Sequence, residues 1–365
     1  MPPNSTVADD IPATRESRIK VLIVDDSAIV RKVLTDVLTE EADIEVVGTA
    51  PDPYVARDKI LSLQPDVLTL DIEMPRMDGL TFLKRLMHYR PIPVIVISSL
   101  GIASSRTALD ALEAGAIDVL AKPGGPQSVG ELRLNLAARI RAAKIARLKN
   151  TLQSPSFSNS PPPRLPRGQS FPSAAIIAIG ASTGGTEAIQ KILSPLPEDC
   201  PAILITQHIP AVFSRSFANR LNELCAIRVR EAENGDKVES GLALVAPGNF
   251  HMLLQRTPLG YRVEIKDGPM VCFQRPAVDV LFHSVAKFAG ADATGVILTG
   301  MGSDGAQGML AMKRAGARNL AQDEASCVVF GMPKEAIRLG GVDRILPLSA
   351  IPGAMLAESR RRNPL

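Results

Sequence analysis

Short apolar runs alternate with amphipathic stretches along most of the chain, beginning at Ile19. In the first part of the chain, five runs of strand length are each followed by a stretch in which apolar residues have helical spacing. The predicted strands are 20–24, 44–49, 67–70, 94–97 and 118–121, and the predicted helices are 28–39, 53–63, 79–89, 104–114 and 129–148. Five successive strand–helix units predict a parallel sheet with helices on both faces.

A second alternating pattern begins at Ala174. Its predicted strands are 175–179, 202–206, 227–230, 242–246, 261–266, 295–298 and 319–322, and its predicted helices are 186–193, 214–224, 277–289, 305–315 and 334–339. The stretch 241–266 has the character of a β-meander because it has no room for crossover helices. The pattern therefore predicts a second α/β domain that is mostly parallel, with a hairpin insert.

The segment between the two patterns, 150–173, is dense in serine and proline. Such a composition cannot bury a core, and its prolines are incompatible with a helix. We therefore expect a linker that lets the two domains pack together or separate. The predicted organisation is a tail at 1–17, a first domain at 18–148, a linker at 149–173, a second domain at 174–358 and a basic tail at 359–365.

Composition narrows the class of protein. The 365 residues are enough for two cores, and the net charge of +3 comes without a clustered basic block, so we expect no nucleic-acid partner. The four cysteines are widely spaced and include no Cys-x-x-Cys pair, which favours reduced thiols in a cytoplasmic protein. No apolar run has the length of a membrane span, and the first 16 residues do not have the pattern of a signal peptide.

Polar residues stand at the carboxyl ends of four of the first five predicted strands. They are Asp25, Asp26, Asp71, Ser98 and Lys122. Three carboxylates at one sheet edge repel one another and call for a hard divalent cation, Mg²⁺ in particular. A hydroxyl and an ammonium beside them suit a phosphoryl group carried on one carboxylate. Each residue alone could be an ordinary turn residue, but all five occupy the edge at which such sheets bind ligands.

This part of the chain resembles the receiver domain of two-component response regulators over roughly 18–148. The matching motifs are Val24-Asp-Asp-Ser27, Leu70-Asp-Ile-Glu-Met-Pro-Arg-Met-Asp-Gly79, Ile97-Ser-Ser99 and Ala121-Lys-Pro123. The resemblance implies a flavodoxin-like (βα)5 fold with Asp71 as phosphoacceptor. It further implies a Mg²⁺ site in which Asp26, Asp71 and the Glu73 carbonyl bind the ion directly and Asp25 binds it through water. Ser98 and Lys122 would contact the phosphoryl oxygens. The position that often carries a switch aromatic is Val119 here, so ring reorientation is not available as a signal.

A candidate nucleophile lies where the second pattern starts. An isoleucine-rich strand ends at Gly180, and a helical pattern opens at Thr186, with Ser182 in the turn between them. The spacing Gly180-x-Ser182-x-Gly184 matches a nucleophile elbow, followed by a helix N-terminus that can stabilise an oxyanion. A phosphate-binding glycine turn and a simple packing turn are the alternatives. The spacing fits neither the dinucleotide fingerprint nor a P-loop.

A nucleophilic serine needs a histidine base. Of the four histidines, His88 lies in the first domain and His283 falls mid-helix, where we expect a satisfied structural side chain. His208 follows the apolar strand 202–206 and so shares the carboxyl edge with Ser182, whereas His251 enters the hairpin region. We therefore prefer His208 and keep His251 as the second candidate.

The base in turn needs an orienting carboxylate. Asp304 follows a predicted strand and a glycine-rich turn, just before a helix. A simple helix N-cap is its alternative role, and Asp279 and Asp323 are weaker candidates. The order Ser182, His208, Asp304 differs from that of α/β-hydrolases, so the elbow motif does not place the domain in that fold.

The second domain is similar to the catalytic domain of the chemotaxis receptor methylesterases, the CheB family. The matching motifs are Ile179-Gly-Ala-Ser-Thr-Gly-Gly185, Gln207-His-Ile-Pro210, Ala246-Pro-Gly-Asn-Phe-His251, Arg275-Pro-Ala-Val-Asp-Val-Leu-Phe282 and Leu298-Thr-Gly-Met-Gly-Ser-Asp-Gly-Ala306. The resemblance implies a Rossmann-like fold, the triad Ser182, His208 and Asp304, and an oxyanion contact from the Met301 backbone amide.

The same resemblance implies a biological role. It implies hydrolysis of glutamate methyl esters on methyl-accepting chemoreceptors, deamidation of receptor glutamines, and no metal in the esterase site. It also implies phosphorylation by a chemotaxis histidine kinase, relief of inhibition by the receiver, and contact with membranes only through receptors. A non-catalytic docking module is the second hypothesis. A DNA-binding regulator ranks last, because the output region lacks a basic helix-turn-helix segment.

Overall fold

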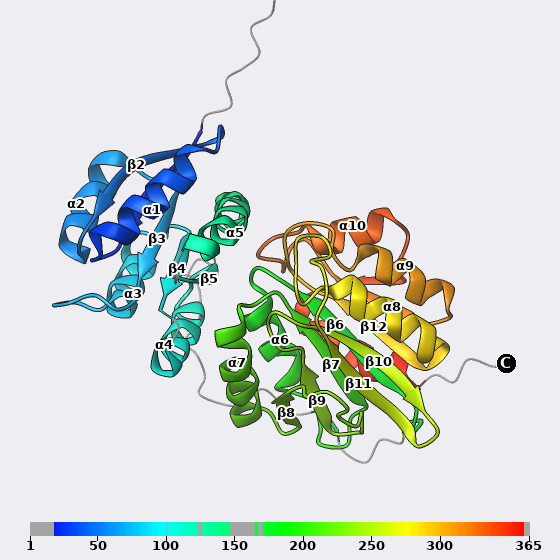
Figure 1. Cartoon of the computed structure of the whole chain (residues 1–365). Coiled ribbons are helices and arrows are strands. Elements are labelled where there is room, and N and C mark those ends of the chain that lie inside the picture. Colours follow the sequence, from blue (N-terminus) through cyan, green and yellow to red (C-terminus); the bar gives the residue numbers. More distant parts are fainter. Residues whose placement is uncertain (1–17, 100, 123–125, 147–164, 167–170, 361–365) are drawn as a thin grey trace, which may run out of the picture.

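The computed structural model describes residues 18–99, 101–122, 126–146, 165–166 and 171–360. Figure 1 shows two α/β units, each built around its own sheet, with α4 of the first beside α7 of the second. The predicted linker lies mostly outside the described residues, as does Pro123 of the lysine–proline motif. Within the linker, the Leu165 N–H donates to the Pro195 carbonyl oxygen of the second unit at 2.8 Å.

The first unit is a five-stranded parallel sheet in the order β2-β1-β3-β4-β5. Its strands are β1 (Ile19–Val24), β2 (Ile44–Ala50), β3 (Val67–Asp71), β4 (Val94–Ser98) and β5 (Asp118–Ala121). Its helices are α1 (Ala28–Thr39), α2 (Pro53–Leu63), α3 (Gly79–Tyr89), α4 (Ile102–Glu113) and α5 (Pro126–Ile145). The predicted doubly covered parallel sheet is confirmed. Ser27, Asp52 and Asp78 accept from first-turn N–H groups, which fixes where α1, α2 and α3 begin.

The second unit is a seven-stranded parallel sheet in the order β14-β13-β12-β6-β7-β9-β8. Its strands are β6 (Ile176–Ala181), β7 (Ala202–Gln207), β8 (Arg228–Glu231), β9 (Leu242–Val245), β12 (Ala293–Ile297), β13 (Arg318–Gln322) and β14 (Arg344–Leu346). The chain leaves β6 toward β7 on one side and later returns to β12 on the other. The carboxyl end of β6 is therefore a topological switch point, the usual place for a ligand in an open α/β sheet.

Successive residues of β6 face opposite sides of the sheet, as strand geometry requires. Ile177 and Ile179 join a core on the side of α6, α7 and α11, whereas Ile176 and Ala178 join a core on the side of α8, α9 and α10. Because both faces are covered, the strand is apolar throughout. The helices are α6 (Gly185–Leu193), α7 (Ala211–Leu224), α8 (Val278–Phe288), α9 (Ala306–Arg314), α10 (Met332–Arg338) and α11 (Ile351–Arg360).

The meander predicted for 241–266 is wrong in its first strand. Leu242–Val245 is β9, which pairs in parallel with both β7 and β8, and each of its four residues is buried. A run that is apolar on both faces is typical of a parallel-sheet strand rather than of a meander. Only β10 (His251–Thr257) and β11 (Gly260–Lys266) form the antiparallel hairpin insert. The short edge strand β14 and the helix α11 were not predicted.

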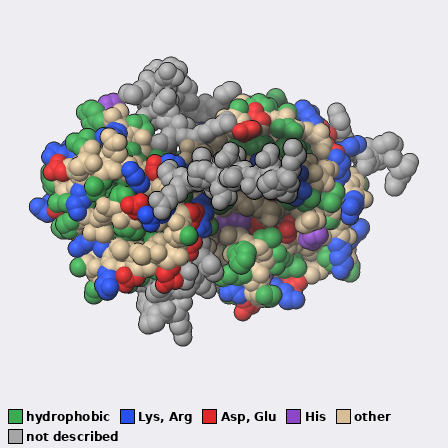
Figure 2. All heavy atoms as spheres, turned by 90° about the horizontal axis from the view of Figure 1, so that it is seen from above, with side chains coloured by type: hydrophobic (Ala, Val, Ile, Leu, Met, Phe, Trp, Pro, Cys, Tyr) green, Lys and Arg blue, Asp and Glu red, His purple; other side chains and the backbone are tan. Residues whose placement is uncertain are grey.

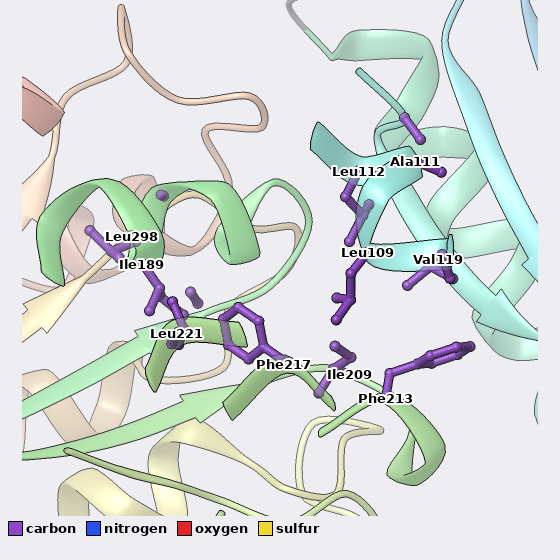
Figure 3. Close-up of a cluster of buried hydrophobic side chains, with 14 of the residues drawn as sticks. Leu109, Ala111, Leu112, Val119, Ile189, Ile209, Phe213, Phe217, Leu221 and Leu298 are labelled. Carbon is purple, nitrogen blue, oxygen red and sulfur yellow. The ribbon is translucent and has the colours of Figure 1, made fainter. Parts of the chain in front are cut away.

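The two units share an apolar contact between α4 and α7. Leu109, Leu112 and Val119 of the first unit belong to the same buried cluster as Ile209 and Phe213 of the second, as Figure 3 shows. Val119, at the position of the missing switch aromatic, is 1% exposed. Val119 of β5 therefore belongs to the apolar cluster that spans the two units.

Ionic contacts flank this apolar contact. Arg220 of α7 pairs with Asp110 and Glu113 of α4, at 2.6 and 2.5 Å. The Ser105 hydroxyl of α4 donates to the Val212 carbonyl oxygen at 3.1 Å. These polar contacts set the orientation of α4 against α7 around the apolar centre.

The surface carries charges of both signs. On the face seen in Figure 2, Lys and Arg side chains are interspersed with Asp and Glu side chains. Within the described part of the chain, no helix has both the length and the apolar character required to cross a membrane.

Candidate active site and acidic pocket

Ser182 lies in the turn between β6 and α6. Its N–H donates to the Thr299 carbonyl oxygen at 3.0 Å, and its carbonyl oxygen accepts from Gln207 Nε2 at 2.8 Å. Gly184, with φ of 74°, provides the left-handed residue that lets the strand turn sharply into the helix. The two strands beside β6 thus hold the backbone on either side of the serine hydroxyl.

His208 directly follows β7 and lies beside the end of β6, as its strand position predicts. Its Nε2 is 2.7 Å from Asp304 Oδ2, and both side chains are almost fully buried. Its Nδ1 is buried and has no hydrogen-bond partner among the described residues. The ring therefore has one nitrogen fixed by a carboxylate and one nitrogen available for chemistry.

Asp304 acts as a cap, but for a helix other than the one it precedes. Its carboxylate accepts from the Val278 and Asp279 N–H groups at the start of α8, at 2.7 and 2.9 Å. In return, Asp279 Oδ1 accepts from the Gly308 N–H of α9 at 2.7 Å, and burial raises the pKa of Asp279. The N-terminal dipole of α8 favours negative charge on Asp304. The carboxylate is therefore held rigidly while it faces His208.

Ser182, His208 and Asp304 line one cavity of about 260 Å³. Met301, whose backbone amide was predicted to contact an oxyanion, lines the same cavity. Among the described residues no hydrogen bond joins Ser182 to His208. Catalytic hydrogen bonds are often longer in ligand-free enzymes and shorten when substrate binds.

The alternative candidates lie elsewhere or are already satisfied. His251 Nε2 donates to the Pro269 carbonyl oxygen at 2.9 Å while its Nδ1 accepts from the Ala277 N–H at 3.2 Å, so neither nitrogen is free to act as a base. His283 is exposed on α8 rather than satisfied within a core, so that expectation is wrong. Asp323 accepts from Ser326 in a local turn.

Several residues around the serine were not predicted. Gln207 and Thr299 hold the turn, and the Thr183 hydroxyl donates to Asp118 Oδ2 of the first unit at 2.9 Å. Arg139 of α5 forms an ion pair with Asp118 and lines the cavity together with Asn135 and Ala138 of the same helix. Two polar residues, Thr206 and Gln207, end the otherwise apolar strand β7, and this sequence feature could have identified Gln207. The contacts with α5 join distant segments and had no local signal.

The acidic pocket of the first unit gathers the carboxylates predicted from the strand ends. Asp25, Asp26 and Asp71 each place one oxygen within 4.8 Å of the others. Lys122 Nζ lies 2.8 Å from Asp71 Oδ2 and 3.0 Å from Asp25 Oδ2. Ser98 is fully buried at the end of β4.

The pKa values of the groups in this pocket are shifted by burial and by neighbouring charges. Burial raises the pKa of Asp25, and hydrogen bonding to Lys122 only partly offsets it. Burial alone would lower the pKa of Lys122, but its hydrogen bonds to Asp71 and Asp25 raise it. Hydrogen bonds from Ser104 and Ser99 lower the pKa of Glu73. An all-oxygen donor set with excess negative charge fits a hard divalent cation such as Mg²⁺.

Comparison with known proteins agrees with these features. Residues 177–355 match the CheB methylesterase family, and residues 21–132 match the response regulator receiver domain. The chain is 57% identical over 336 residues to protein-glutamate methylesterase/protein-glutamine glutaminase 2 of Syntrophus aciditrophicus, covering 92% of this chain and 97% of the relative. It is 55% identical over 344 residues to the protein-glutamate methylesterase/protein-glutamine glutaminase of Escherichia coli K12, covering 94% and 97%.

Among solved structures, the crystal structure of the Thermotoga maritima CheB methylesterase catalytic domain is similar, at 37% identity and a TM-score of 0.49. That match covers 50% of this chain and 97% of the other. Relatives that match over nearly the whole chain confirm both resemblances drawn from the sequence motifs. The chain belongs to the CheB methylesterase family, with a response-regulator receiver domain ahead of the methylesterase domain.

Proposed function

We propose that this chain is a phosphorylation-regulated serine esterase that hydrolyses glutamate methyl esters on chemoreceptors and deamidates receptor glutamines. The observation that carries the proposal is the His208–Asp304 pair, which shares one cavity with Ser182 at the switch point of the sheet. The names of the relatives, protein-glutamate methylesterase/protein-glutamine glutaminase, supply the substrate class.

In the proposed mechanism, Ser182 Oγ attacks the side-chain carbonyl carbon while His208 Nδ1 accepts the hydroxyl proton. The protonated ring then gives that proton to the leaving methoxy oxygen of the ester, and methanol departs. When the substrate is glutamine, the amide nitrogen receives the proton and ammonia departs. Water attacks the acyl–serine ester with His208 again as base, which releases glutamate. Asp304 keeps Nε2 protonated, and the Met301 backbone amide stabilises the oxyanion.

The assignment of the proton acceptor follows from the hydrogen bonds of the ring. Because Nε2 is engaged with Asp304 at 2.7 Å, only Nδ1 can accept from the serine. The carboxylate is fixed in turn by two backbone N–H groups of α8, so it cannot follow the ring, and rotation of the ring would break its hydrogen bond to Asp304. Such fixed orientation is what a triad acid contributes.

Regulation in this proposal acts through the receiver domain. Its helix α5 places Asn135, Ala138 and Arg139 in the wall of the catalytic cavity, and Asp118 binds the residue next to the serine. A domain that narrows the cavity in this way inhibits access to a protein substrate. Phosphorylation of Asp71 by a chemotaxis histidine kinase in the cytoplasm would weaken these contacts and open the site.

The acidic pocket fits Mg²⁺ as the cation of that phosphorylation. Asp26 and Asp71 would bind it directly, Asp25 through water, and Glu73 through its carbonyl oxygen. Bound Mg²⁺ supplies positive charge that offsets the carboxylates and the phosphoryl group. Ser98 and Lys122 would contact the phosphoryl oxygens, and Lys122 is already directed at Asp71.

The test is methanol release from methylated receptor membranes, with and without a phosphodonor. We expect Ser182→Ala to abolish release and the wild type to release methanol faster when phosphorylated. Ser194→Ala is the matched control, because its hydroxyl donates to the Gln190 carbonyl oxygen and the residue does not line the catalytic cavity. Equal release by wild type and Ser182→Ala would contradict the esterase and favour a docking module.

A further inference from the structure

An unusual backbone turn forms one edge of the catalytic cavity. Val271 and Gln274 exchange both backbone hydrogen bonds, at 3.1 and 2.9 Å, so Cys272 and Phe273 form a two-residue hairpin turn. Their φ angles are 51° and 60°. Turns with two left-handed residues normally carry Asn-Gly or Gly-Gly. A left-handed residue with a β-carbon costs on the order of 1 kcal/mol, and this turn has two in succession.

The surrounding loops hold the turn in this conformation. The Asn249 N–H donates to the Arg275 carbonyl oxygen at 3.1 Å. The Arg275 guanidinium donates to Asp267 and to the Gly268 carbonyl oxygen, both at 2.6 Å. Strain of this kind persists where neighbouring contacts over-determine the backbone, and it is concentrated at ligand-binding positions.

Folding gains little from the Phe273 side chain. The residue is 77% exposed, although its atoms line the cavity that holds Ser182 and His208. An exposed phenylalanine in a strained conformation lowers stability on both counts, and glycine would serve the turn better. A strained backbone conformation that is not compensated by side-chain packing indicates that the residue has a functional role.

We propose that Phe273 is a substrate-binding residue that contacts aliphatic side chains of the protein substrate beside the glutamate ester or glutamine. This role rests on the proposed function, and it concerns the residues of the substrate on either side of the glutamate or glutamine. The ring has no hydrogen-bonding group, so a contact with aliphatic side chains suits it best. Because the ring and Ser182 line the same cavity, a protein segment that delivers its side chain to the serine passes next to the ring.

Two further exposed apolar residues extend the contact surface. Met270 is 44% exposed on the loop of Phe273, and Phe250 is 43% exposed on the loop joined to it by the Asn249–Arg275 hydrogen bond. We call Phe250, Met270 and Phe273 the apolar rim. Arg139 of the receiver lines the cavity wall. A substrate that displaces the receiver can still bind the apolar rim, which belongs to the second domain.

The neighbouring thiol does not offer a competing explanation for the turn. Partial desolvation and the charges of Asp304 and Asp279 raise the pKa of Cys272, although the residue is exposed. The thiol is therefore neutral at physiological pH and is a poor nucleophile. Its Sγ lies 4.0 Å from Asp279 Oδ2, so Cys272 faces the buried acids while Phe273 faces outward.

The experiment compares the full-length wild type with Phe273→Ala, Phe273→Leu and Phe273→Gly on two probes. The first is methanol release at several concentrations of methylated receptor. The second is phosphonylation of Ser182 by a small fluorophosphonate, in which fluoride leaves and no protein part is present. Leu259→Ala is the matched control, because Leu259 is 91% exposed in the same domain and does not line the cavity.

We expect Phe273→Ala to lower kcat/KM on receptor roughly tenfold, mainly through KM, as for a truncated aromatic contact. Fluorophosphonate labelling should stay within about twofold of wild type, because the triad is untouched. Phe273→Leu should restore most of the receptor activity. Phe273→Gly should match the alanine loss while its melting temperature equals or exceeds that of wild type.

Receptor kcat/KM within about twofold of wild type for Phe273→Ala would overturn the inference. So would parallel losses on receptor and fluorophosphonate, since these indicate damage to the triad. If wild type labels with fluorophosphonate but releases no methanol from receptor, the proposed function itself is wrong, and the inference falls with it.

Discussion

The hydroxyl of Thr183 donates to Asp118 Oδ2 at 2.9 Å, which ties the residue after the candidate nucleophile to the first residue of β5. Both side chains are buried, and Asp118 also pairs with Arg139. The conformation of the Ser182 turn and the position of the receiver are thus joined through a single carboxylate. A change in one therefore changes the free energy of the other, which is the physical requirement for coupling between two sites.

The contact between α4 and α7 should hold the receiver in its inhibitory position. Arg220→Ala removes two ion pairs across this contact, with Asp110 and Glu113. These pairs are partly exposed, so we expect a loss of about 1 kcal/mol in docking free energy. Unphosphorylated esterase activity should then rise about fivefold. The measurement is methanol release from receptor membranes without a phosphodonor.

The matched control removes an arginine that makes its ion pair within one domain, so the charge of the protein changes by the same amount. Arg228 pairs with Glu239 within the catalytic domain at 3.0 Å, so Arg228→Ala should leave the basal rate unchanged. Raising the salt concentration should increase the wild-type basal rate and leave that of Arg220→Ala nearly constant. An unaltered basal rate for Arg220→Ala would show that the ion pairs do not contribute to inhibition.

Asp304→Asn should impair catalysis far more than folding. The asparagine keeps one oxygen for one of the two α8 amides, but its NH₂ group cannot accept from His208 Nε2, so Nε2 is no longer held in its protonated form. We expect kcat to fall roughly 10³–10⁴-fold, as when the acid of a serine triad becomes an amide. Circular dichroism should still show a cooperative transition. Asp323→Asn, in a polar turn near Ser326, is the control and should retain its rate.

Most of the site residues that the sequence predicted were found from their positions at the ends of predicted strands. Asp25, Asp71, Ser182 and His208 each follow an apolar run, and parallel topology alone brings such ends to one edge. Asp304 was found by the same rule, yet its hydrogen bonds to the start of α8 were not foreseeable. They depend on how α8 and α9 pack, which no local pattern encodes.

Other features escaped prediction for related reasons. The parallel pairing of β9 was missed because the connection from β8 is too short for a helix, and short connections usually indicate antiparallel pairs. The contacts of Thr183 with Asp118 and of Arg220 with Asp110 join residues more than 60 positions apart. Docking of two domains is decided by shape and charge across surfaces, which a single sequence does not display.

Gly300 should be irreplaceable because it lies against the serine. A β-carbon there would lie 2.3 Å from Met332 Sδ and 2.7 Å from Ser182 Cβ, closer than β-carbons approach other heavy atoms. Gly300→Ala should therefore displace the turn and lower kcat roughly 10²-fold, as for a nucleophile misplaced by about 1 Å. Gly353→Ala is the control, since nothing lies within 4 Å and it is exposed on α11. That variant should keep full activity and gain up to about 1 kcal/mol of stability.

Removal of divalent cations should separate the two sites of the chain. The oxygens of Asp25, Asp26 and Asp71 cluster in the receiver, whereas the proposed chemistry at Ser182 requires no metal. With EDTA present, acetyl phosphate should therefore fail to stimulate methanol release, while the basal rate stays the same. Added Mg²⁺ should restore the stimulation in wild type but not in Asp71→Asn, which lacks the phosphoacceptor. A basal rate that falls with EDTA would contradict a metal-free esterase site, and stimulation that survives EDTA would contradict the cation site at Asp71.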